Sequence, residues 1–445
     1  MISPSRTWRT AAVLAAATLT LSACGSSDTP GAGESPTEAE PTDTATSSPS
    51  PSPTESATGD GGGGSMAKGD GVLTVGTLLP QTGSLAFLGP PEFAGVDLAV
   101  QEINDAGGVL GKPVVQERAD SGDGTPNLAP GETNKLLNAD ADVIVGAASS
   151  SVSLSVIDKI IGAGVLQISP ANTSTAFDTY NDKGLYFRTA PSDVLQGAVM
   201  ANLVAGDGFD NVAILARQDS YGEALAKQVD EVFTSNGGTV VDNVLYDAEA
   251  SNFSAEVSQI AGKSPEAIVL IAFDETTKII PEMIKNGIGP KDVQIYFVDG
   301  NTADYSKDFP PGTLEGVRAT YPGAELTADF RKELLKADPK LTEFTYGPES
   351  YDATMLTALA ATAAENDSGE AIASQMQAVS IGGTKCSGYA ECAEMLEKGE
   401  DIDYEGVSGP IDFNDTGSPS AATIGIFEYV ADNTYEPVRY VTGQI

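Results

Sequence analysis

The strongest constraint on the fold is a series of short apolar runs that recurs from about residue 72 onward. Helical stretches separate most of these runs, which are Val72–Leu78, Val143–Val145, Val165–Ile168, Val212–Ala216, Thr239–Tyr246, Ala267–Ala272 and Gln294–Val298. Such apolar runs are typical of strands that are buried on both faces of a parallel sheet. The alternation predicts an α/β fold of parallel sheets with helices on both sides, and its length favours two domains.

The clearest helix is predicted over Pro91–Ala106. Proline suits the first position of a helix, and the pair Gly107-Gly108 would end it. Between them, apolar residues recur at helical spacing: Phe93, Val96, Val100 and Ile103. One face of this helix should therefore pack against a sheet.

The composition excludes several classes of function. The 445 residues contain 63 Asp and Glu, 24 Lys and Arg and no histidine, for a net charge of -39. Nucleic-acid binding needs a basic face, and the Ser-His-Asp and Cys-His catalytic sets and the HExxH zinc site need an imidazole. The glycine cluster at Gly108–Pro113 also lacks the spacing of a phosphate loop. We therefore expect no nucleic-acid partner, no metal and no cofactor. Paired carboxylates are the one remaining route to catalysis, and we do not expect an enzyme.

The first 24 residues are typical of an exported lipoprotein. Arg6 and Arg9 precede an apolar run, Ala11–Leu21, that is too short to span a bilayer. The run ends in Leu21-Ser22-Ala23-Cys24, which resembles the lipobox of bacterial lipoproteins. We expect residues 1–23 to be a signal peptide and Cys24 to carry the lipid that anchors the protein to the outer face of the cell membrane. Plain secretion with an incidental cysteine is the alternative.

A segment with almost no large apolar residue follows this cysteine. Residues 24–71 consist mainly of Ser, Thr, Pro, Gly, Asp and Glu. Such a segment buries too little apolar surface to offset the entropy of ordering it. We expect a disordered tether between the lipidated cysteine and the folded body.

Two further cysteines, Cys386 and Cys392, are separated by five residues. Outside the membrane, an isolated pair predicts a disulfide that closes a short loop. A redox or metal site with this spacing is the alternative.

Short motifs distributed over residues 72–445 carry a resemblance to a known family. The motifs include Val75–Gly83, Ala106–Gly111, Val145–Ser151, Ile168–Thr173, Asp219–Gly222, Asn252–Ser254 and Gly409-Pro410. Their order and spacing resemble the leucine/isoleucine/valine-binding branch of the type I periplasmic binding proteins. These are the extracytoplasmic receptors of ABC importers.

The resemblance implies two doubly wound parallel-sheet domains that are joined by three crossovers, with the ligand held in the cleft between them. The crossovers would lie near Pro191, Asp299 and Gly409. The N-terminal lobe would be 72–191 plus 300–408, and the C-terminal lobe would be 192–299 plus 409–445. This cleft agrees with the general rule that open α/β sheets bind ligands at the carboxyl ends of their strands.

The resemblance also implies which residues bind the α-carboxylate and ammonium of an amino acid. Ser150, with its neighbour Ser149, would come from a serine-rich loop, while Ala171 and Thr173 would come from the loop after Ser169-Pro170. Hydroxyls and backbone N–H groups at a helix N-terminus are suitable donors to a carboxylate. The alternative is that the serines only cap a helix.

The ammonium needs a carboxylate, because a buried unpaired cation is costly. The family supplies it just after a strand of the second domain. Strict register places Thr276 at that acid, and we assign the role to the adjacent Glu275, with Asp274 or Asp299 as substitutes. The alternative is that Asp274 and Glu275 cap the following helix. Tyr221 and Phe253 would line the second-domain face. Leu88 stands where the family often has an aromatic residue, which leaves the specificity of the side-chain pocket open.

The implied function is that of a solute receptor whose lobes close on a small neutral, branched-chain or similar amino acid and dock on ABC permease subunits. We expect a monomer. A receptor of the same fold for an amide, urea or an aromatic acid is one alternative, and a ligand sensor without transport is another.

Overall fold

The computed structural model describes residues 69–124 and 127–444. All of these described residues belong to one compact unit. The predicted signal peptide, the lipidation site Cys24 and nearly all of the tether lie outside the described residues, so those predictions stay predictions. Within the described part, none of the helices has the length and apolar character needed to cross a membrane.

The first of two large sheets has five parallel strands in the order β2-β1-β3-β4-β5. Their bounds are β1 Thr74–Leu79, β2 Val115–Asp120, β3 Val143–Gly146, β4 Leu166–Ser169 and β5 Tyr186–Arg188. Every residue of β1, β3 and β4 is buried. The apolar runs therefore became central strands, because only such strands are covered on both faces.

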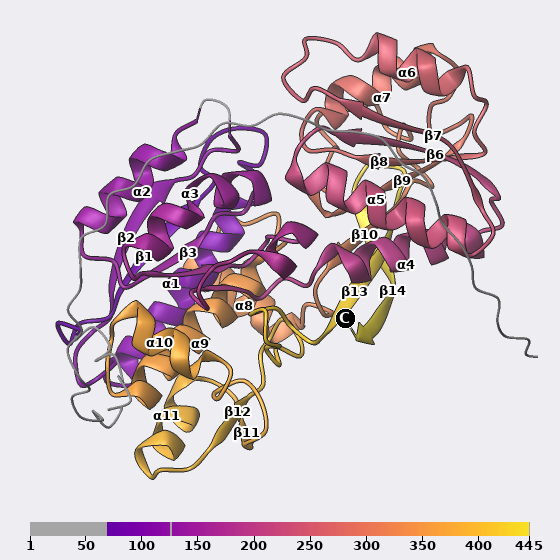
Figure 1. The fold of residues 1–445 in the computed structure, drawn as a ribbon. Helices are drawn as coiled ribbons and strands as arrows, with labels where there is room; N and C mark the ends of the chain where they lie inside the picture. Colours follow the sequence, from indigo (N-terminus) through magenta and orange to yellow (C-terminus); the bar gives the residue numbers. More distant parts are fainter. Residues whose placement is uncertain (1–68, 125–126, 445) are drawn as a thin grey trace, which may run out of the picture. The chain divides into compact units, whose positions relative to one another are not determined.

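Helices cover both faces of this sheet (Figure 1). Leu78 and Ile144 face a cluster with two of them, α2 (Ala129–Asn138) and α3 (Ser150–Gly162). Alternate strand residues face the other cluster, which is built from α1 (Gly89–Asp105) and α9 (Gly347–Ala364). The remaining elements outside the second sheet include η1 Thr175–Thr179, α8 Ala328–Ala337, α10 Gly369–Met376, α11 Tyr389–Glu397 and a small parallel pair, β11 Thr384–Cys386 with β12 Ile402–Tyr404.

The second sheet has seven strands in the order β14-β13-β10-β9-β8-β6-β7. The bounds are β6 Asn211–Arg217, β7 Thr239–Tyr246, β8 Ala267–Ile271, β9 Gln294–Phe297, β10 Arg318–Pro322, β13 Ala421–Tyr429 and β14 Tyr435–Gln444. The five strands from β10 to β7 are parallel, whereas β13 and β14 pair antiparallel. One face carries α4 Asp193–Gly206 and α5 Ser220–Ser235, and the other carries α6 Ser254–Ala261 and α7 Thr276–Lys285.

The structure confirms the predicted α/β fold of two parallel-sheet domains. The predicted helix is α1, which begins two residues earlier than Pro91 and ends at Asp105. The first crossover between the sheets falls between the end of β5 at Arg188 and the start of α4 at Asp193.

The second and third crossovers differ from the predicted positions near Asp299 and Gly409. The strand β10 pairs with β9 and β13, and Leu314 and Val317 join the core of the second sheet. Residues 300–322 therefore belong with the second sheet. Near the third crossover, Ile411 and Phe413 are buried in the core of the first sheet, which the chain leaves only before β13. We call residues 72–190 plus 323–420 the first lobe, and residues 193–322 plus 421–444 the second lobe.

Cys386 and Cys392 form a disulfide, as predicted, with their Cα atoms 5.4 Å apart. It joins the end of β11 to α11. Among the described residues, no group of three or more His, Cys, Asp and Glu side chains is arranged to hold a metal ion.

Candidate functional site

Side chains of the two lobes meet where strands of both sheets end. Ser151 Oγ lies 3.0 Å from Ser220 Oγ, and Ser174 Oγ donates to the carbonyl of Ser220 at 2.7 Å. Apolar residues of the first lobe also share one buried cluster with Tyr221 and Phe273 of the second lobe: Leu85, Leu88, Ala148 and Ala171. The predicted ligand loops are therefore adjacent to the second lobe.

The loop after β3 presents Ser149 and Ser150. The chain can turn there because Gly146 has a φ of +127°, and a Cβ at this position would lie 2.0 Å from the carbonyl oxygen of Leu78. Ser149 occupies the N-cap position of α3, but its hydroxyl makes no capping hydrogen bond and is buried without a partner. Ser150 Oγ accepts a long hydrogen bond, 3.4 Å, from the N–H of Ser174. Helix capping alone therefore does not account for these serines.

The loop after β4 is fastened to the serine-rich loop. Ser169 Oγ accepts the N–H of Asn172 at 2.9 Å and donates to the carbonyl of Ala147 at 2.7 Å. Asn172 Nδ2 donates to the carbonyl of Ala148 at 2.8 Å. These bonds hold Ala171 and Thr173 beside Ser149 and Ser150, so the structure brings together the four first-lobe residues that the sequence predicted.

Asp299 receives hydrogen bonds from three side chains. They come from Tyr221 Oη at 2.6 Å, Tyr346 Oη at 2.8 Å and Gln196 Nε2 at 2.9 Å. Burial raises the pKa of Asp299, and the three donors oppose that shift. Tyr346 precedes α9 in the first lobe, so Asp299 is bonded from both lobes.

Glu275 makes a different set of contacts. Its Oε1 accepts hydrogen bonds from Arg217 Nη1 and Tyr246 Oη, both at 2.9 Å. Glu275 is the N-cap residue of α7, yet its side chain makes no capping hydrogen bond. Asp274 is exposed. The structure thus pairs Glu275 with a cation of the protein itself.

The remaining predicted residues divide between two clusters. Tyr221 stacks on Phe273, with ring centroids 5.5 Å apart, and Leu88 lies in the same buried cluster. Phe253 instead packs edge-on against Tyr246 in the cluster on the opposite face of the second sheet. The structure therefore does not bring Phe253 to the other candidate residues.

Asp193 is a buried acid that sequence reasoning missed. It is the first residue of α4 and fully buried, and neither carboxylate oxygen makes a well-formed hydrogen bond. Burial, followed by the negative charge of Asp299, raises its pKa well above the usual range, whereas the neighbouring Thr173 hydroxyl lowers it. An Asp in the first turn of a helix ordinarily interacts with the helix dipole. The sequence pattern therefore does not distinguish Asp193 from an ordinary first-turn acid.

Two more polar atoms near Asp193 are buried without a partner. The Thr173 hydroxyl lies beside Asp193 outside hydrogen-bonding geometry, and Thr173 accepts the N–H of Asp193 with its backbone carbonyl at 2.7 Å. Gln196 stands one turn further along α4, and its Oε1 has no donor. Buried polar atoms are almost always satisfied, so an unsatisfied group here indicates a place for ligand atoms.

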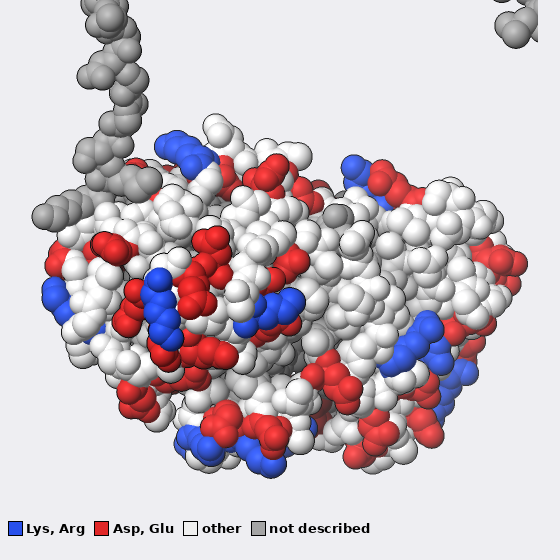
Figure 2. Space-filling model, turned by 90° about the horizontal axis from the view of Figure 1, so that it is seen from below, with Lys and Arg blue, Asp and Glu red and all other residues white. Residues whose placement is uncertain are grey.

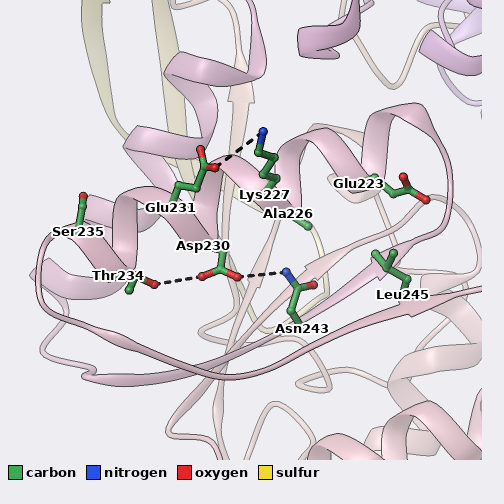
Figure 3. Close-up of a pocket in the computed structure, with 9 residues that line it drawn as sticks. All are labelled: Glu223, Ala226, Lys227, Asp230, Glu231, Thr234, Ser235, Asn243 and Leu245. Carbon is green, nitrogen blue, oxygen red and sulfur yellow. Dashed lines mark hydrogen bonds and ion pairs between the residues drawn. The ribbon is translucent and has the colours of Figure 1, made fainter. Parts of the chain in front are cut away.

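A cavity lies elsewhere, between α5 and β7 of the second lobe (Figure 3). Its volume is about 720 Å³, and its lining comes from α5 and β7: Glu223, Ala226, Lys227, Asp230, Glu231, Thr234, Ser235, Asn243 and Leu245. Asp230 accepts hydrogen bonds from Thr234 and Asn243 across it. The lining of this cavity includes none of the candidate residues. On the face seen in Figure 2, acidic side chains and a smaller number of Lys and Arg are scattered among other residues.

The site combines hydroxyl donors on the first lobe with carboxylates where the lobes meet. Hydroxyls suit an anionic group of a ligand, and buried carboxylates suit a cationic group. The set is therefore suited to holding a small zwitterion by hydrogen bonds and charge.

Comparison with known proteins shows the family to which the chain belongs. Residues 72–420 match the family described as "Periplasmic binding protein". The chain is 27% identical over 355 residues to the chemotactic signal transduction system substrate-binding protein BasB of Halobacterium salinarum, which covers 76% of this chain and 83% of that protein. It is 33% identical over 199 residues to the Leu/Ile/Val-binding protein BraC3 of Rhizobium johnstonii, covering 44% and 53% of the two chains.

A solved structure shows the same fold. The solute-binding protein of an ABC transporter from R. palustris, in complex with benzoate, superposes with a TM-score of 0.68 at 18% identity, covering 84% of this chain and 98% of that one. The family match spans well over half of the chain. The protein therefore belongs to the periplasmic binding protein family, whose members are solute-binding proteins.

Proposed function

We propose that the protein captures a small neutral amino acid, branched-chain or similar, between its lobes and delivers it to an ABC permease. It does so as a monomer on the outer face of the cell membrane, anchored through Cys24, and it is not an enzyme. The observation that carries the proposal is the meeting of unpartnered first-lobe hydroxyls with buried carboxylates at the junction of the lobes.

The carboxylate of the ligand belongs beside the two first-lobe loops. The hydroxyls of Ser149 and Thr173 are buried without well-formed hydrogen bonds, and Ser150 begins α3 next to them. The N-terminus of this helix adds partial positive charge. These hydroxyl donors are themselves neutral.

The ammonium of the ligand belongs beside Asp299 and Asp193. An ammonium has three N–H donors, which match the unpaired oxygens of Asp193 and the Oε1 of Gln196. Hydrogen bonds from Tyr221 and Tyr346 hold Asp299 in place. The negative charge of Asp299 also acts on Asp193. We prefer this pair to the predicted Glu275, because Arg217 already neutralises Glu275.

The apolar part of the ligand would contact Leu85, Leu88, Ala148 and the rings of Tyr221 and Phe273. All five lie in one buried cluster. An aliphatic side chain gains about 25 cal/mol for each Å² of apolar surface that it buries there. The aliphatic residue at position 88 supports a small aliphatic ligand.

An aromatic acid is the second candidate, supported by the similarity to the benzoate-bound receptor. Benzoate has no cation, so it would leave Asp193 and Asp299 without a charge partner, and the same holds for urea and simple amides. A sensor without transport is supported by the chemotactic relative.

Isothermal titration calorimetry tests the proposal. The purified protein is titrated with the twenty amino acids, benzoate, 4-hydroxybenzoate, urea and acetamide. A neutral aliphatic amino acid should bind with submillimolar affinity. Binding of benzoate or urea in the absence of any amino-acid binding would refute the amino-acid assignment.

A further inference from the structure

Arg217 is a buried cation that makes no hydrogen bond to Asp193 or Asp299, the acids assigned to the ligand ammonium. It ends β6 and is 5% exposed. Its Nη1 donates to Glu275 at 2.9 Å and its Nε donates to Asp219 at 2.5 Å. Burial alone would lower its pKa, but Glu275 and Asp219 outweigh burial and raise it, so the guanidinium stays charged.

The guanidinium also packs over the ring of Phe273, which belongs to the candidate site. The Cζ of Arg217 is 3.4 Å from the centroid of the Phe273 ring. Tyr221 stacks on the same ring, with the two ring centroids 5.5 Å apart. A Cβ at Gly300 would approach the Phe273 ring to 2.7 Å, so the ring is confined there as well. Phe273 is thus enclosed between Arg217, Tyr221 and the backbone of Gly300.

Arg217 reaches Tyr221 by a second route. Its partner Asp219 is the N-cap of α5 and accepts the N–H groups of Tyr221 at 3.1 Å and of Gly222 at 2.8 Å. A Cβ at Gly222 would lie 2.1 Å from the carbonyl oxygen of Arg217, so α5 starts directly against the end of β6. The backbone and the ring of Tyr221 are both set by groups that Arg217 contacts.

We propose that Arg217 is a positioning residue, which through Phe273 and Asp219 fixes where the Tyr221 hydroxyl meets Asp299. All these contacts lie within the second lobe. The lobe therefore holds its half of the site in the binding geometry before closure, which lowers the ordering cost of ligand binding. Glu275 then serves as the counter-ion of Arg217. This inference rests on the proposed function of the site.

A purely structural ion pair is the competing explanation, and an Arg217→Lys variant separates the two. Lysine restores the charge pairing with Glu275 but cannot lie flat on Phe273 or bond two acids as a planar fork. We expect the melting temperature of the lysine variant to lie within a few degrees of that of the wild type. The variant should nevertheless bind L-leucine about tenfold more weakly. An Arg217→Met variant should lose both stability and affinity.

A double-mutant comparison tests whether the effect passes through the aromatic ring. In a Phe273→Leu background, Arg217→Lys should change the affinity for L-leucine by less than about twofold, because the stacking partner is already gone. Arg318→Lys is the matched control, since Arg318 pairs with Asp207 at 2.6 Å in the same lobe, away from the site. It should leave the affinity unchanged.

Two outcomes overturn the inference while leaving the proposed function intact. One is an Arg217→Lys protein that binds L-leucine as tightly as the wild type. The other is full additivity of the two substitutions. If the wild type binds no amino acid, the proposed function fails, and a crystal structure of the Arg217→Lys variant then tests the inference directly. Unmoved Phe273 and Tyr221 rings in that structure would overturn it.

Discussion

The hydroxyl of Tyr221 donates a 2.6 Å hydrogen bond to Asp299 Oδ1. The second oxygen of Asp299 accepts the hydroxyl of Tyr346, at 2.8 Å, from the other lobe. A carboxylate with such donors on both oxygens is fixed in orientation, although burial raises its pKa. It can present its charge to one cation at a defined place.

Asp299→Asn should therefore remove most of the amino-acid affinity. The amide keeps an acceptor for one tyrosine hydroxyl but loses the charge that faces the ammonium. Hydrogen bonds to charged groups contribute about 1.5–3 kcal/mol, so we expect a loss of roughly 10- to 100-fold in titration calorimetry. Asp230→Asn removes the same charge from a cavity of the same lobe that contains none of the candidate residues, and it should have no effect. An Asp299→Asn affinity within twofold of the wild type would exclude this role.

Asp193→Asn should separate stability from affinity. Because burial raises the pKa of Asp193, the folded protein holds a proton that the unfolded chain releases. The ligand-free wild type then loses stability as pH rises from the unfolded pKa, about 4, through the folded pKa. The asparagine variant lacks this loss, so its melting temperature relative to that of the wild type should increase as pH increases. Its affinity for the amino acid should be lower than that of the wild type. A variant that is less stable at every pH would indicate a structural role instead.

Ligand binding should also release protons. An ammonium beside Asp193 and Asp299 stabilises their ionised forms and lowers both pKa values, so the affinity should rise with pH across the range in which they titrate. Calorimetry in buffers of different ionisation enthalpy measures the number of protons released. That number should fall in Asp193→Asn. Equal binding enthalpies in all buffers would contradict the prediction.

Ser149→Ala combined with Thr173→Ala should weaken binding and leave the melting temperature nearly unchanged, because neither hydroxyl has a well-formed hydrogen bond within the protein. Ser153→Ala is the opposite control. Its hydroxyl accepts the N–H of Ala147 at 2.9 Å, so its loss leaves a buried donor unsatisfied and should cost about 1–3 kcal/mol of stability. Chemical denaturation measures the stability of both variant proteins, and calorimetry measures their affinity for the amino acid.

Removing the disulfide with Cys386→Ala and Cys392→Ala should lower the free energy of unfolding by about 2–3 kcal/mol, since the closed loop is short. The bond lies beside β11 and α11, apart from the candidate site, so the affinity for an amino acid should not change. A large loss of affinity would connect this region to the ligand.

Cys24→Ala should release the protein from membranes, because the lipidated cysteine is the predicted anchor. Fractionation of cells that express either form measures this. Persistent membrane association of the variant would show that another segment or partner holds it.

The sequence predicted the parts of the fold that local pattern determines. The apolar runs that lie at Val143–Val145 and Ala267–Ala272 became β3 and β8, because buried parallel strands need such composition. The strand β10 was missed, since Arg318–Pro322 is short and contains a proline and an arginine. Its pairing with β9 and β13 moved the second crossover.

The candidate site was predictable only where the order of motifs carried it. Ser149, Ser150, Ala171 and Thr173 lie together because two neighbouring parallel strands end side by side. The partner of Glu275 is Arg217, 58 residues away, and no local pattern indicates such a pair. Asp193 resembles an ordinary first-turn acid, and only its burial without hydrogen bonds distinguishes it.

The position of α9 has a consequence for biosynthesis. The strands β1 to β5 end at Arg188, but α9, which shares the burial of one face of their sheet with α1, begins only at Gly347. A growing chain must therefore keep the part of that apolar face beneath α9 uncovered while the whole parallel part of the second lobe is translated. The first lobe cannot finish folding before the second has emerged, so a chain shortened before α9 leaves an aggregation-prone sheet rather than a smaller working domain.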